Sequence, residues 1–600
     1  MKDHLKKNLR LFVGFFILNF LSFSALATDY YFSQSLGDDL NDGLTSSTPF
    51  KSLDRANSLS LNPGDRVFFK SGETWFGMFW PKGSGILGNP IEISSYGGLE
   101  KAKFDGNGYQ SALLIYNEDY YNISNLEITN QNSHLDSFGS IKKLPGFFGE
   151  ENDWGSGGNI RFGIKIVANN RSLEGFNFHN LIINNIYPSP GSPNNTPVAG
   201  SPLKNKNQGY GIKFESQSDV VIGNIYTISN VQITNSTISR TGHYGVWIKP
   251  LGLSGIDFYK HSNFVVSGCK FLDTGGAGFV PVKATNVLVE NNTFNGTGSS
   301  DDPRMYGRGS GTWPFDSSDV VIQNNVFMNA RGPLDSYGVH IDYNNENVVV
   351  QYNFSYNNEG GFVQILGSNV NVGYRYNISV ADGYRIQGVN NAIQNGRIFH
   401  ISDYCGDNSS CPNVGTFVYN NTVFVPLNTS PEIYFHEGSG ETLFKNNLVY
   451  VAGVGNRLTT YIPNEGVSYD ISNNLFYPNT SFNFDQDLLD NASFTDPSLI
   501  SPGSTIASRY KLMTGSPAKF AGEIISGSSD YVDYNQNNGG QDFFGNSVSN
   551  SSSPHIGAYN GNELLGEVIE VPIPYQYTLI LLLVIFSSIY KISNKNSPLA

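Results

Sequence analysis

Short apolar strands led by glycine recur through the middle of the chain. Hydrophobic side chains occupy alternate positions in each of them, as expected of a strand with one buried face. Seven such segments begin at Gly211, Gly245, Gly278, Gly311, Gly338, Gly361 and Gly383. Successive starts are 34, 33, 33, 27, 23 and 22 residues apart. A strand of constant pattern within a repeat of variable length predicts a solenoid.

A second apolar run follows most of these strands and ends at asparagine pairs such as Asn291-Asn292 and Asn324-Asn325. Asparagine tolerates left-handed backbone angles, so each pair marks a corner between strands. No part of this region keeps a helical apolar period. Each turn of the chain is therefore expected to hold two or three short strands. Equivalent strands of successive turns then pair in parallel about 4.8 Å apart, which predicts an all-β parallel β-helix.

Residues at both ends of this region carry a family resemblance. Asn41-Asp-Gly43 and Pro63-Gly-Asp65 near the start, with Gly515-Ser-Pro-Ala518 and Ile556-Gly-Ala-Tyr559 near the end, resemble secreted proteins of the pectate-lyase-like superfamily. The resemblance spans residues 28–560 and implies a right-handed parallel β-helix. It implies less about activity, because that superfamily includes lyases, hydrolases, epimerases and adhesins.

The composition narrows the class of partner. Charged residues make up 15% of the chain, aromatic residues 13%, and the formal net charge is −14. Nucleic acid and anionic lipid are therefore excluded as expected partners. A weakly charged, aromatic-rich surface suits polysaccharide instead. Because a solenoid grows by adding turns, residues 28–560 are expected to form one domain and the protein to be a monomer.

Both ends of the chain carry targeting patterns. Residues 1–27 join basic residues, an apolar stretch and a small-residue cleavage site, which is typical of a signal peptide. After a linker at 561–572, residues 573–590 are predicted to form a transmembrane or sorting helix, followed by a short basic tail at 591–600. The protein is thus expected to be exported to the cell envelope or beyond. Its C-terminal segment could be a membrane anchor or a sorting tail that is cleaved, and the sequence leaves both alternatives open.

Three cysteines are present. In an oxidising compartment, Cys405 and Cys411 are expected to form a small disulfide loop. Cys269 lies within an apolar strand and is expected to be a core residue.

Alternation within the glycine-led strands divides their residues into inward and outward sets. Pairs such as Val246/Ile248, Trp313/Phe315 and Val339/Ile341 are expected inside. One outward ladder is then Glu215, Lys249, Lys283, Asp316, Asp342 and Leu366. The other is Lys213, Trp247, Pro281, Pro314, His340 and Gln364, with Arg385 one turn later. Stacking would bring two lysines and two aspartates into one groove, walled by loops such as residues 295–308.

Three chemistries fit this groove. A lyase would use Lys249 or Lys283 as the base; a hydrolase would use Asp316 and Asp342 as paired carboxyl groups; and the same aspartates would suit a possible Ca²⁺ site. Expected catalytic residues are Lys249, Lys283, Asp316, Asp342 and His340. Expected substrate-binding residues are Glu215, Lys213, Trp247, Gln364 and Arg385. A lyase acting on an extracellular, uronate-containing polysaccharide is the leading hypothesis; the alternatives are a hydrolase and a non-catalytic adhesin.

Aromatic side chains near the groove complete the expectations. Trp247 is expected to stack on a sugar ring, and Trp313 to belong to the core. Tyr306, Tyr343 and Tyr384 are candidates to extend a sugar platform.

Overall fold

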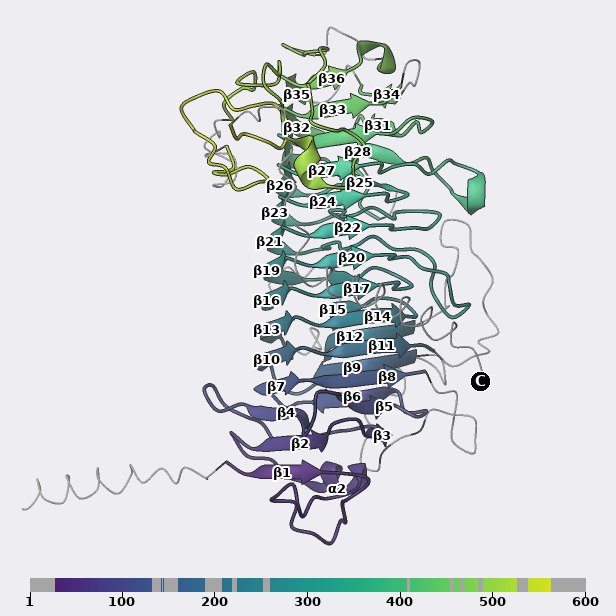
Figure 1. The fold of residues 1–600 in the computed structure, drawn as a ribbon, viewed down its shortest axis with the longest axis vertical. Helices are drawn as coiled ribbons and strands as arrows, with labels where there is room; N and C mark the ends of the chain where they lie inside the picture. The colour runs from purple at the N-terminus through teal and green to yellow at the C-terminus, as the bar shows by residue number, and fades with distance from the viewer. Residues whose placement is uncertain are drawn as a thin grey trace, which may run out of the picture.

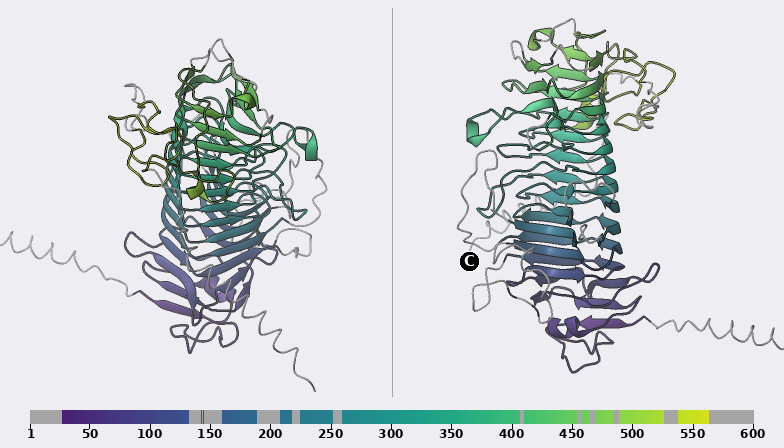
Figure 2. Two further views of the ribbon diagram at one scale, coloured as in Figure 1. Left: turned by 45° about the horizontal axis from the view of Figure 1, so that its top comes forward. Right: turned by 180° about the vertical axis from the view of Figure 1, so that it is seen from behind.

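The computed structural model describes residues 27–131, 142, 144, 160–188, 208–217, 224–251, 259–406, 410–453, 458–463, 469–483, 489–525 and 538–562. Over these residues the chain winds into a column of stacked short strands (Figures 1 and 2). Every pairing between its named strands is parallel: β1 with β2 at one end and β33 with β36 at the other are examples. The predicted parallel β-helix is confirmed.

Two long sheets form two faces of the column. The first has 14 strands among the described residues: β1 (Asp29–Phe32), β2 (Arg66–Lys70), β4 (Ile91–Tyr96), β7 (Tyr121–Ser124), β10 (Leu173–His179), β13 (Ile228–Thr234), β16 (His261–Ser267), β19 (Ala284–Glu290), β21 (Ser318–Gln323), β23 (Glu346–Gln351), β26 (Val370–Arg375), β29 (Asn413–Tyr419), β32 (Gly440–Lys445) and β35 (Tyr469–Ser472).

The second long sheet has 13 strands in the same described ranges: β3 (Thr74–Phe76), β5 (Ala102–Asp105), β8 (Leu126–Asn130), β11 (Ile182–Ile186), β14 (Thr237–Thr241), β17 (Lys270–Leu272), β20 (Thr293–Asn295), β22 (Val326–Met328), β24 (Phe354–Tyr356), β27 (Ile378–Val380), β30 (Thr422–Val425), β33 (Leu448–Val451) and β36 (Leu475–Tyr477).

The third face is divided into two sheets. Its N-terminal part is a five-stranded sheet of β6 (Ser111–Tyr116), β9 (Ile160–Ala168), β12 (Gln208–Gln217), β15 (Val246–Leu251) and β18 (Phe279–Pro281). Its C-terminal part is a four-stranded sheet of β25 (Gly361–Ile365), β28 (Arg397–Ile401), β31 (Glu432–Phe435) and β34 (Thr459–Tyr461).

The two turns between these sheets, which begin near Gly311 and Gly338, form isolated bridges only. Thr312 bridges Phe279 on one side and Val339 on the other. Pro281 and Pro314 lie beside this junction, and proline has no N–H to donate to a ladder. The third face therefore loses its regular sheet at this point while keeping its register.

The interior of the column is apolar, and most of the predicted inward pairs are there. Val246, Ile248, Val339 and Ile341 are fully buried in one continuous core. Fully burying side chains of this size contributes about 1.5–3 kcal/mol each. The last predicted repeat is wrong, because Gly361 pairs with Arg397 and not with a residue near Gly383.

The asparagine corners are confirmed, and their side chains form a ladder. Asn291 and Asn324 have left-handed backbones (φ 57° and 55°). The asparagine that follows each of them is buried, and its amide bonds to the equivalent residue one turn later, as from Asn292 Nδ2 to Asn325 Oδ1 at 3.0 Å. The ladder of buried amides continues through Asn325, Asn353, Asn377, Asn421, Asn447 and Asn474.

Few helical segments are present among the described residues: α2 (Leu53–Ser58), η2 (Val389–Asn391), η3 (Asn479–Ser481) and η5 (Ala507–Tyr510). Helix α2 lies beside β1 at the N-terminal end of the column (Figure 1) and buries Leu53 and Ala56 there. The C-terminal segment folds back along the column, where Tyr352 donates to the carbonyl of Gly539 at 2.9 Å.

The predictions for cysteine are confirmed. Cys405 and Cys411 form a disulfide, and Cys269 is buried and free.

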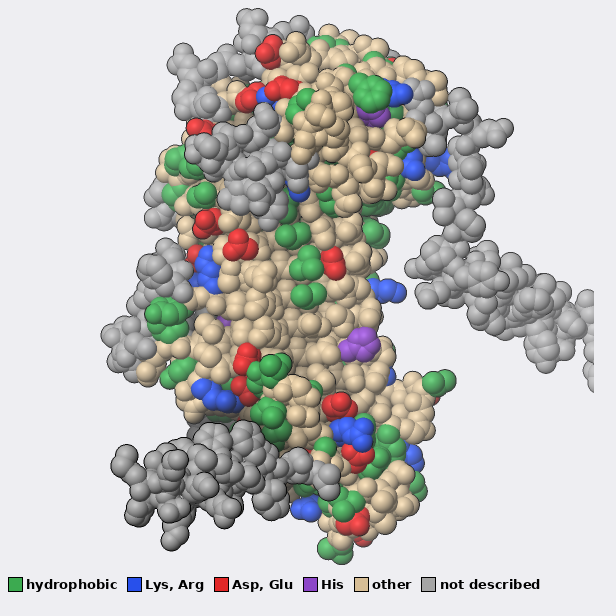
Figure 3. Space-filling view, turned by 90° about the vertical axis from the view of Figure 1, so that its left-hand side faces the viewer, with side chains coloured by type: hydrophobic (Ala, Val, Ile, Leu, Met, Phe, Trp, Pro, Cys, Tyr) green, Lys and Arg blue, Asp and Glu red, His purple; other side chains and the backbone are tan. Residues whose placement is uncertain are grey.

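Figure 3 shows the side of the molecule along which the 14-stranded sheet runs. That surface is mostly uncharged, and its charged side chains lie scattered in small groups of mixed sign. This distribution fits the low charge content of the sequence.

Candidate active site

Two outward rows of side chains cross the third face from one sheet to the other. The Trp313 row, as the strand register sets it, contains Lys165, Lys213, Trp247, Val280, Trp313, His340, Gln364, His400, Tyr434 and Tyr461. The Asp342 row contains Val167, Glu215, Lys249, Val282, Phe315, Asp342, Leu366, Ser402 and His436. These rows are the predicted ladders, with changes at two turns.

At those two turns the predicted inward and outward positions are displaced by one residue from those that the strand register sets. Phe279 takes the interior position in place of Val280, and Thr312 in place of Trp313, which faces outward. The prediction that Trp313 belongs to the core is wrong. Lys283 and Asp316 fall just beyond the strands, in left-handed turns with φ of 49° and 50°. A one-residue shift exchanges the two faces of a strand, and this moves both residues out of the ladder.

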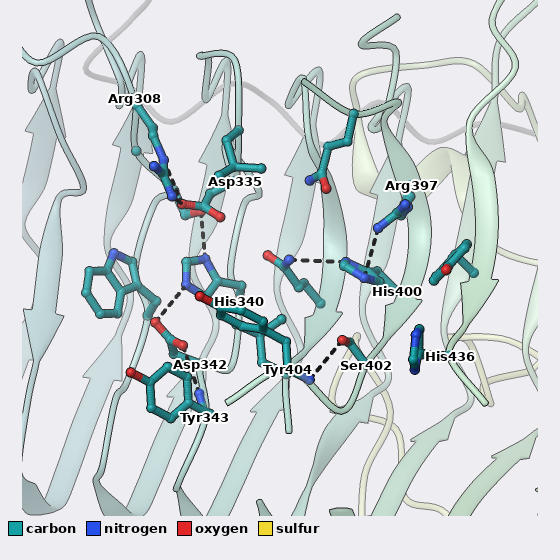
Figure 4. A pocket seen from close by; sticks show the side chains of 18 of the residues that line it. Arg308, Asp335, His340, Asp342, Tyr343, Arg397, His400, Ser402, Tyr404 and His436 are labelled. Atoms are coloured by element: carbon teal, nitrogen blue, oxygen red, sulfur yellow. Dashed lines mark hydrogen bonds and ion pairs between the residues drawn. The ribbon is translucent and has the colours of Figure 1, made fainter. Parts of the chain in front are cut away.

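A pocket of about 630 Å³ opens where the third face changes from one sheet to the next (Figure 4). The two outward rows line its floor. Loop residues preceding the strands form its wall, among them Tyr244, Tyr306, Arg308, Asp335 and Gln394. A concave site with polar groups and aromatic walls is typical of small-molecule and sugar binding.

Asp335 is one of two carboxyl groups in the pocket, and it is paired with an arginine. Arg308 Nε lies 2.9 Å from Asp335 Oδ2, and the Nη2 atom bonds to the same oxygen. Burial alone would raise the pKa of Asp335, but the positive charges of Arg308 and of nearby groups lower it below its ordinary value. Asp335 is therefore ionised at neutral pH in the empty site.

Asp342 is the second carboxyl group, and it lies beside a histidine. His340 Nε2 is 3.7 Å from Asp342 Oδ2, while His340 Nδ1 is 2.9 Å from Ser310 Oγ. The indole of Trp313 stacks on the imidazole of His340, with ring centres 5.4 Å apart. These contacts hold the histidine and the carboxylate next to each other on the pocket floor, as Figure 4 shows.

The other end of the pocket is built on β28 and β31. His400 lies between Gln364 and Arg397, with its Nδ1 atom 3.1 Å from the Gln364 amide and its Nε2 atom 2.9 Å from Arg397 Nη1. Burial and the Arg397 charge lower the pKa of His400 well below its ordinary value, so the imidazole is neutral. Arg397 is paired in turn with Glu432 at 3.0 Å.

The predicted site residues separate into four places. His340, Asp342 and Gln364 line the pocket, with Tyr306 and Tyr343 nearby on its wall. Lys213, Glu215, Trp247 and Lys249 lie on the five-stranded sheet, where Glu215 pairs with Lys213 and Lys165. Tyr384 and Arg385 border a small separate cavity of about 110 Å³.

Lys283 and Asp316 form the fourth place, a corner ion pair outside the pocket lining. Their charged atoms are 3.3 Å apart, as the stacking argument required. The predicted contact between Asp316 and Asp342 is wrong, because the register sets Asp342 beside Phe315 and Asp316 accepts from Asn344 Nδ2 at 3.1 Å. The carboxylate pair proposed for Ca²⁺ is thus not formed, and the described residues contain no other group of three or more acidic, His or Cys side chains arranged for a metal ion.

Sequence reasoning missed Asp335, Arg308, Arg397, His400 and His436. The last three could have been found by continuing the strand pattern past Gly383, since Arg397-Ile-Phe-His400 and Glu432-Ile-Tyr-Phe-His436 repeat it. Asp335 and Arg308 lie in loops of irregular length, where periodicity carries no signal.

Comparison with known proteins agrees with the architecture. A family model described as "Right handed beta helix region" matches residues 204–377. The fold is a right-handed parallel β-helix. This confirms the predicted handedness.

Among individual proteins, a lacto-N-biosidase of Bifidobacterium longum is 25% identical over 88% of this chain; the chain spans 36% of the length of that relative. The structure of a GH136 lacto-N-biosidase from Eubacterium ramulus is 20% identical, covering 78% of this chain and 67% of the other with a TM-score of 0.48. Pectate lyase Pel9A is 14% identical over 90% of this chain and 98% of its own, with a TM-score of 0.38.

The predictions for the two ends of the chain fall outside the described residues, apart from Ala27. This holds for the signal peptide at 1–27 and for the helix at 573–590. In the part of the chain that is described, no helix has the length and hydrophobicity needed to span a membrane.

Proposed function

We propose that this protein is a glycoside hydrolase whose active site is the pocket between the two sheets of the third face. The observation that carries the proposal is the presence of Asp335 and Asp342 in one polar pocket with aromatic walls. Glycoside hydrolysis generally needs two carboxyl groups, one to protonate the leaving oxygen and one to act as a nucleophile or a base.

The two carboxyl groups have different surroundings. Asp335 is held ionised by Arg308, and Asp342 lies 3.7 Å from His340 Nε2. An ionised carboxylate is the form needed for a nucleophile or a base. The pocket floor also offers Trp313 as an aromatic surface for a sugar ring.

The substrate we propose is a neutral oligosaccharide of the lacto-N-biose type. The Bifidobacterium longum relative, which is named a lacto-N-biosidase, aligns with 88% of this chain. The low charge content of the chain supports a neutral ligand as well. This choice replaces the uronate lyase that the sequence suggested, since Lys249 and Lys283, the lysines assigned as bases, are not among the residues lining the pocket.

A substrate panel tests the proposal. The full chain is incubated with an aryl lacto-N-bioside, with lacto-N-biose-containing oligosaccharides, and with pectate and alginate oligomers. Release of the aryl alcohol and of the disaccharide is expected from the first two groups. Ultraviolet absorbance of unsaturated products from the uronates would support the lyase instead, and sugar binding without any product would support an adhesin.

Two substitutions then test the residues. Asp335→Asn and Asp342→Asn should each lower kcat/KM by roughly 10²- to 10⁴-fold, the range for loss of an acid or base. Asparagine tolerates the left-handed backbone of Asp335 (φ 51°), so folding should be retained. Asp301→Asn, on an exposed part of the neighbouring loop, is the matched control. Added azide should restore turnover of the aryl glycoside in these variants, and the anomeric configuration of the glycosyl azide formed by each assigns the two roles; full activity in both asparagine variants would end the proposal.

A further inference from the structure

A chain of polar contacts crosses three strands at the C-terminal end of the pocket. It begins at Glu432 on β31, whose carboxylate is 3.0 Å from Arg397 Nε on β28. Arg397 Nη1 lies 2.9 Å from His400 Nε2, and His400 Nδ1 lies 3.1 Å from the side-chain amide of Gln364 on β25. Arg397, His400 and Gln364 all line the pocket, and Gln364 is the one that lies beside His340 in the Trp313 row.

The chemistry of these groups fixes where the proton of His400 lies. A guanidinium only donates hydrogen bonds, so His400 Nε2 must accept from Arg397. Burial and the charge of Arg397 lower the pKa of His400 well below its ordinary value, so the ring carries a single proton. That proton is therefore on Nδ1, and Nδ1 acts as a donor.

A donor at His400 Nδ1 bears on the orientation of Gln364. The nitrogen end of the Gln364 amide is 3.1 Å from Nδ1, closer than the Tyr337 hydroxyl at 3.4 Å, so two N–H groups would face each other in that orientation. Gln364 is 3% exposed, and its Oε1 atom has no hydrogen-bond partner within the described structure. The two ends of an amide are nearly equal in shape, so a half-turn exchanges them. With Oε1 toward His400, the oxygen accepts from Nδ1, and the NH₂ group, a double donor, takes the unpartnered position on this pocket-lining side chain.

The charges at this end identify the kind of ligand such a donor would meet. The positive charge of Arg397 is compensated by Glu432, His400 is neutral, and His436 is 2.8 Å from Asp403. Because these positive charges are already paired, this end of the pocket is a poor binding site for a carboxylate or a sulfate. A hydroxyl or an amide carbonyl of a neutral sugar is an acceptor that needs only a neutral donor.

We propose that Gln364 is a specificity-determining, substrate-binding residue that donates its amide NH₂ to an oxygen of a neutral sugar, and that Glu432, Arg397 and His400 are positioning residues that hold it in that orientation. The inference rests on the proposed function and deepens it, since it names the part of the pocket that selects a neutral sugar.

Binding measured directly tests the role of Gln364 without relying on turnover. Lacto-N-biose and a galacturonate disaccharide are titrated into the full chain by calorimetry. Gln364→Glu keeps an acceptor for His400 but loses the donor, and Gln364→Met loses both. Each should weaken binding of lacto-N-biose about tenfold or more, as expected when a buried donor to a ligand is lost. The charged disaccharide should bind more weakly than lacto-N-biose to the wild type.

A matched control separates this effect from the cost of altering any buried glutamine. Gln351 is likewise buried, and its Oε1 atom accepts from an arginine, Arg375, at 2.8 Å, but it lies on another face. Gln351→Glu should leave the affinity unchanged.

The positioning role has its own readout. His400→Gln supplies another amide donor and should keep the affinity within about threefold, whereas His400→Leu should weaken it by about fivefold or more, because it removes a hydrogen bond to Gln364. Equal affinities for these two variants would overturn the positioning role.

The inference and the proposed function can fail separately. If lacto-N-biose binds and both Gln364 variants lose it while no glycoside is cleaved, the inference stands and the hydrolase proposal falls. Wild-type affinity in both Gln364 variants, or no binding of the neutral disaccharide by the wild type, would overturn the inference.

Discussion

The two halves of the third face share the same outward rows but have become different surfaces. In the N-terminal half, on β12 and β15, the rows hold Lys213, Glu215, Trp247 and Lys249. In the C-terminal half they hold the residues of the pocket. The first half is a continuous sheet with strands of up to ten residues, whereas the second begins where two turns form isolated bridges only.

This difference decides what the charges do. On the continuous sheet Glu215 is 1% exposed and is paired with Lys165 and Lys213, while Lys213 also lies 4.6 Å from the ring centre of Trp247. Those groups satisfy one another. At the junction, the loops that precede the strands bring in Asp335 and Arg308 from outside the repeat, and a cavity remains. Stacked charges alone thus do not make a site; the interruption of the sheet does.

Breaking the buried cluster of Glu215, Lys165 and Lys213 should give the largest effect, a loss of folding stability. Glu215→Gln removes the carboxylate between two buried lysines, and loss of one partner of a buried pair typically costs about 3 kcal/mol. A clear drop in the thermal midpoint is expected. Glu346→Gln, at an exposed position, should leave the midpoint unchanged. An unchanged midpoint in Glu215→Gln would mean that the two halves do not differ in the way described.

The stability of the protein at low pH should depend on the same buried cluster of Glu215, Lys165 and Lys213. Burial alone would raise the pKa of Glu215, but Lys165 and Lys213 lower it from 4.5 to about 2. The unfolded chain then takes up the proton before the folded one, so this contribution to stability is present above pH 4.5 and is lost as the pH falls toward 2. The midpoint of the wild type should therefore fall more steeply over this interval than that of Glu215→Gln; parallel curves would contradict the pairing.

At the junction, Arg308→Met should give the next largest effect. Removing the cation raises the pKa of Asp335, because burial then acts unopposed by its main partner. The limb of the pH–rate profile that Asp335 governs should move to higher pH, with a loss in kcat/KM at neutral pH of about tenfold or more. Arg304→Met, which breaks the Arg304–Asp302 pair on the same loop, is the control. An unmoved profile would exclude Asp335 from the rate-limiting chemistry.

The smallest effect is expected at the corner between the halves. Asp316→Asn leaves the left-handed turn intact and removes only the pair with Lys283 outside the pocket lining. Activity on a lacto-N-bioside should change by less than about threefold, since neither side chain lines the pocket and changes at separate sites are nearly independent. A loss as large as that of Asp342→Asn would place the active site at the corner after all.

The sequence by itself determined the architecture. Glycine-led alternation, asparagine corners and the stacking of equivalent strands are local features repeated at every turn, so the parallel β-helix, its amide ladder and the placement of His340, Asp342 and Gln364 on one face follow from it. The contact between Lys283 and Asp316 could also be predicted, because neighbouring turns align wherever the repeat is kept.

Only the tertiary structure decided where the pocket opens. Phe279 and Thr312 hold the interior positions, one residue away from those predicted, and this places Trp313 in the outward row. Arg308 and Asp335 come from loops of unequal length, whose path depends on what they pack against and not on any period in the chain. The physical reason is that repetition fixes the stacking of strands, whereas a cavity arises where the repetition is broken.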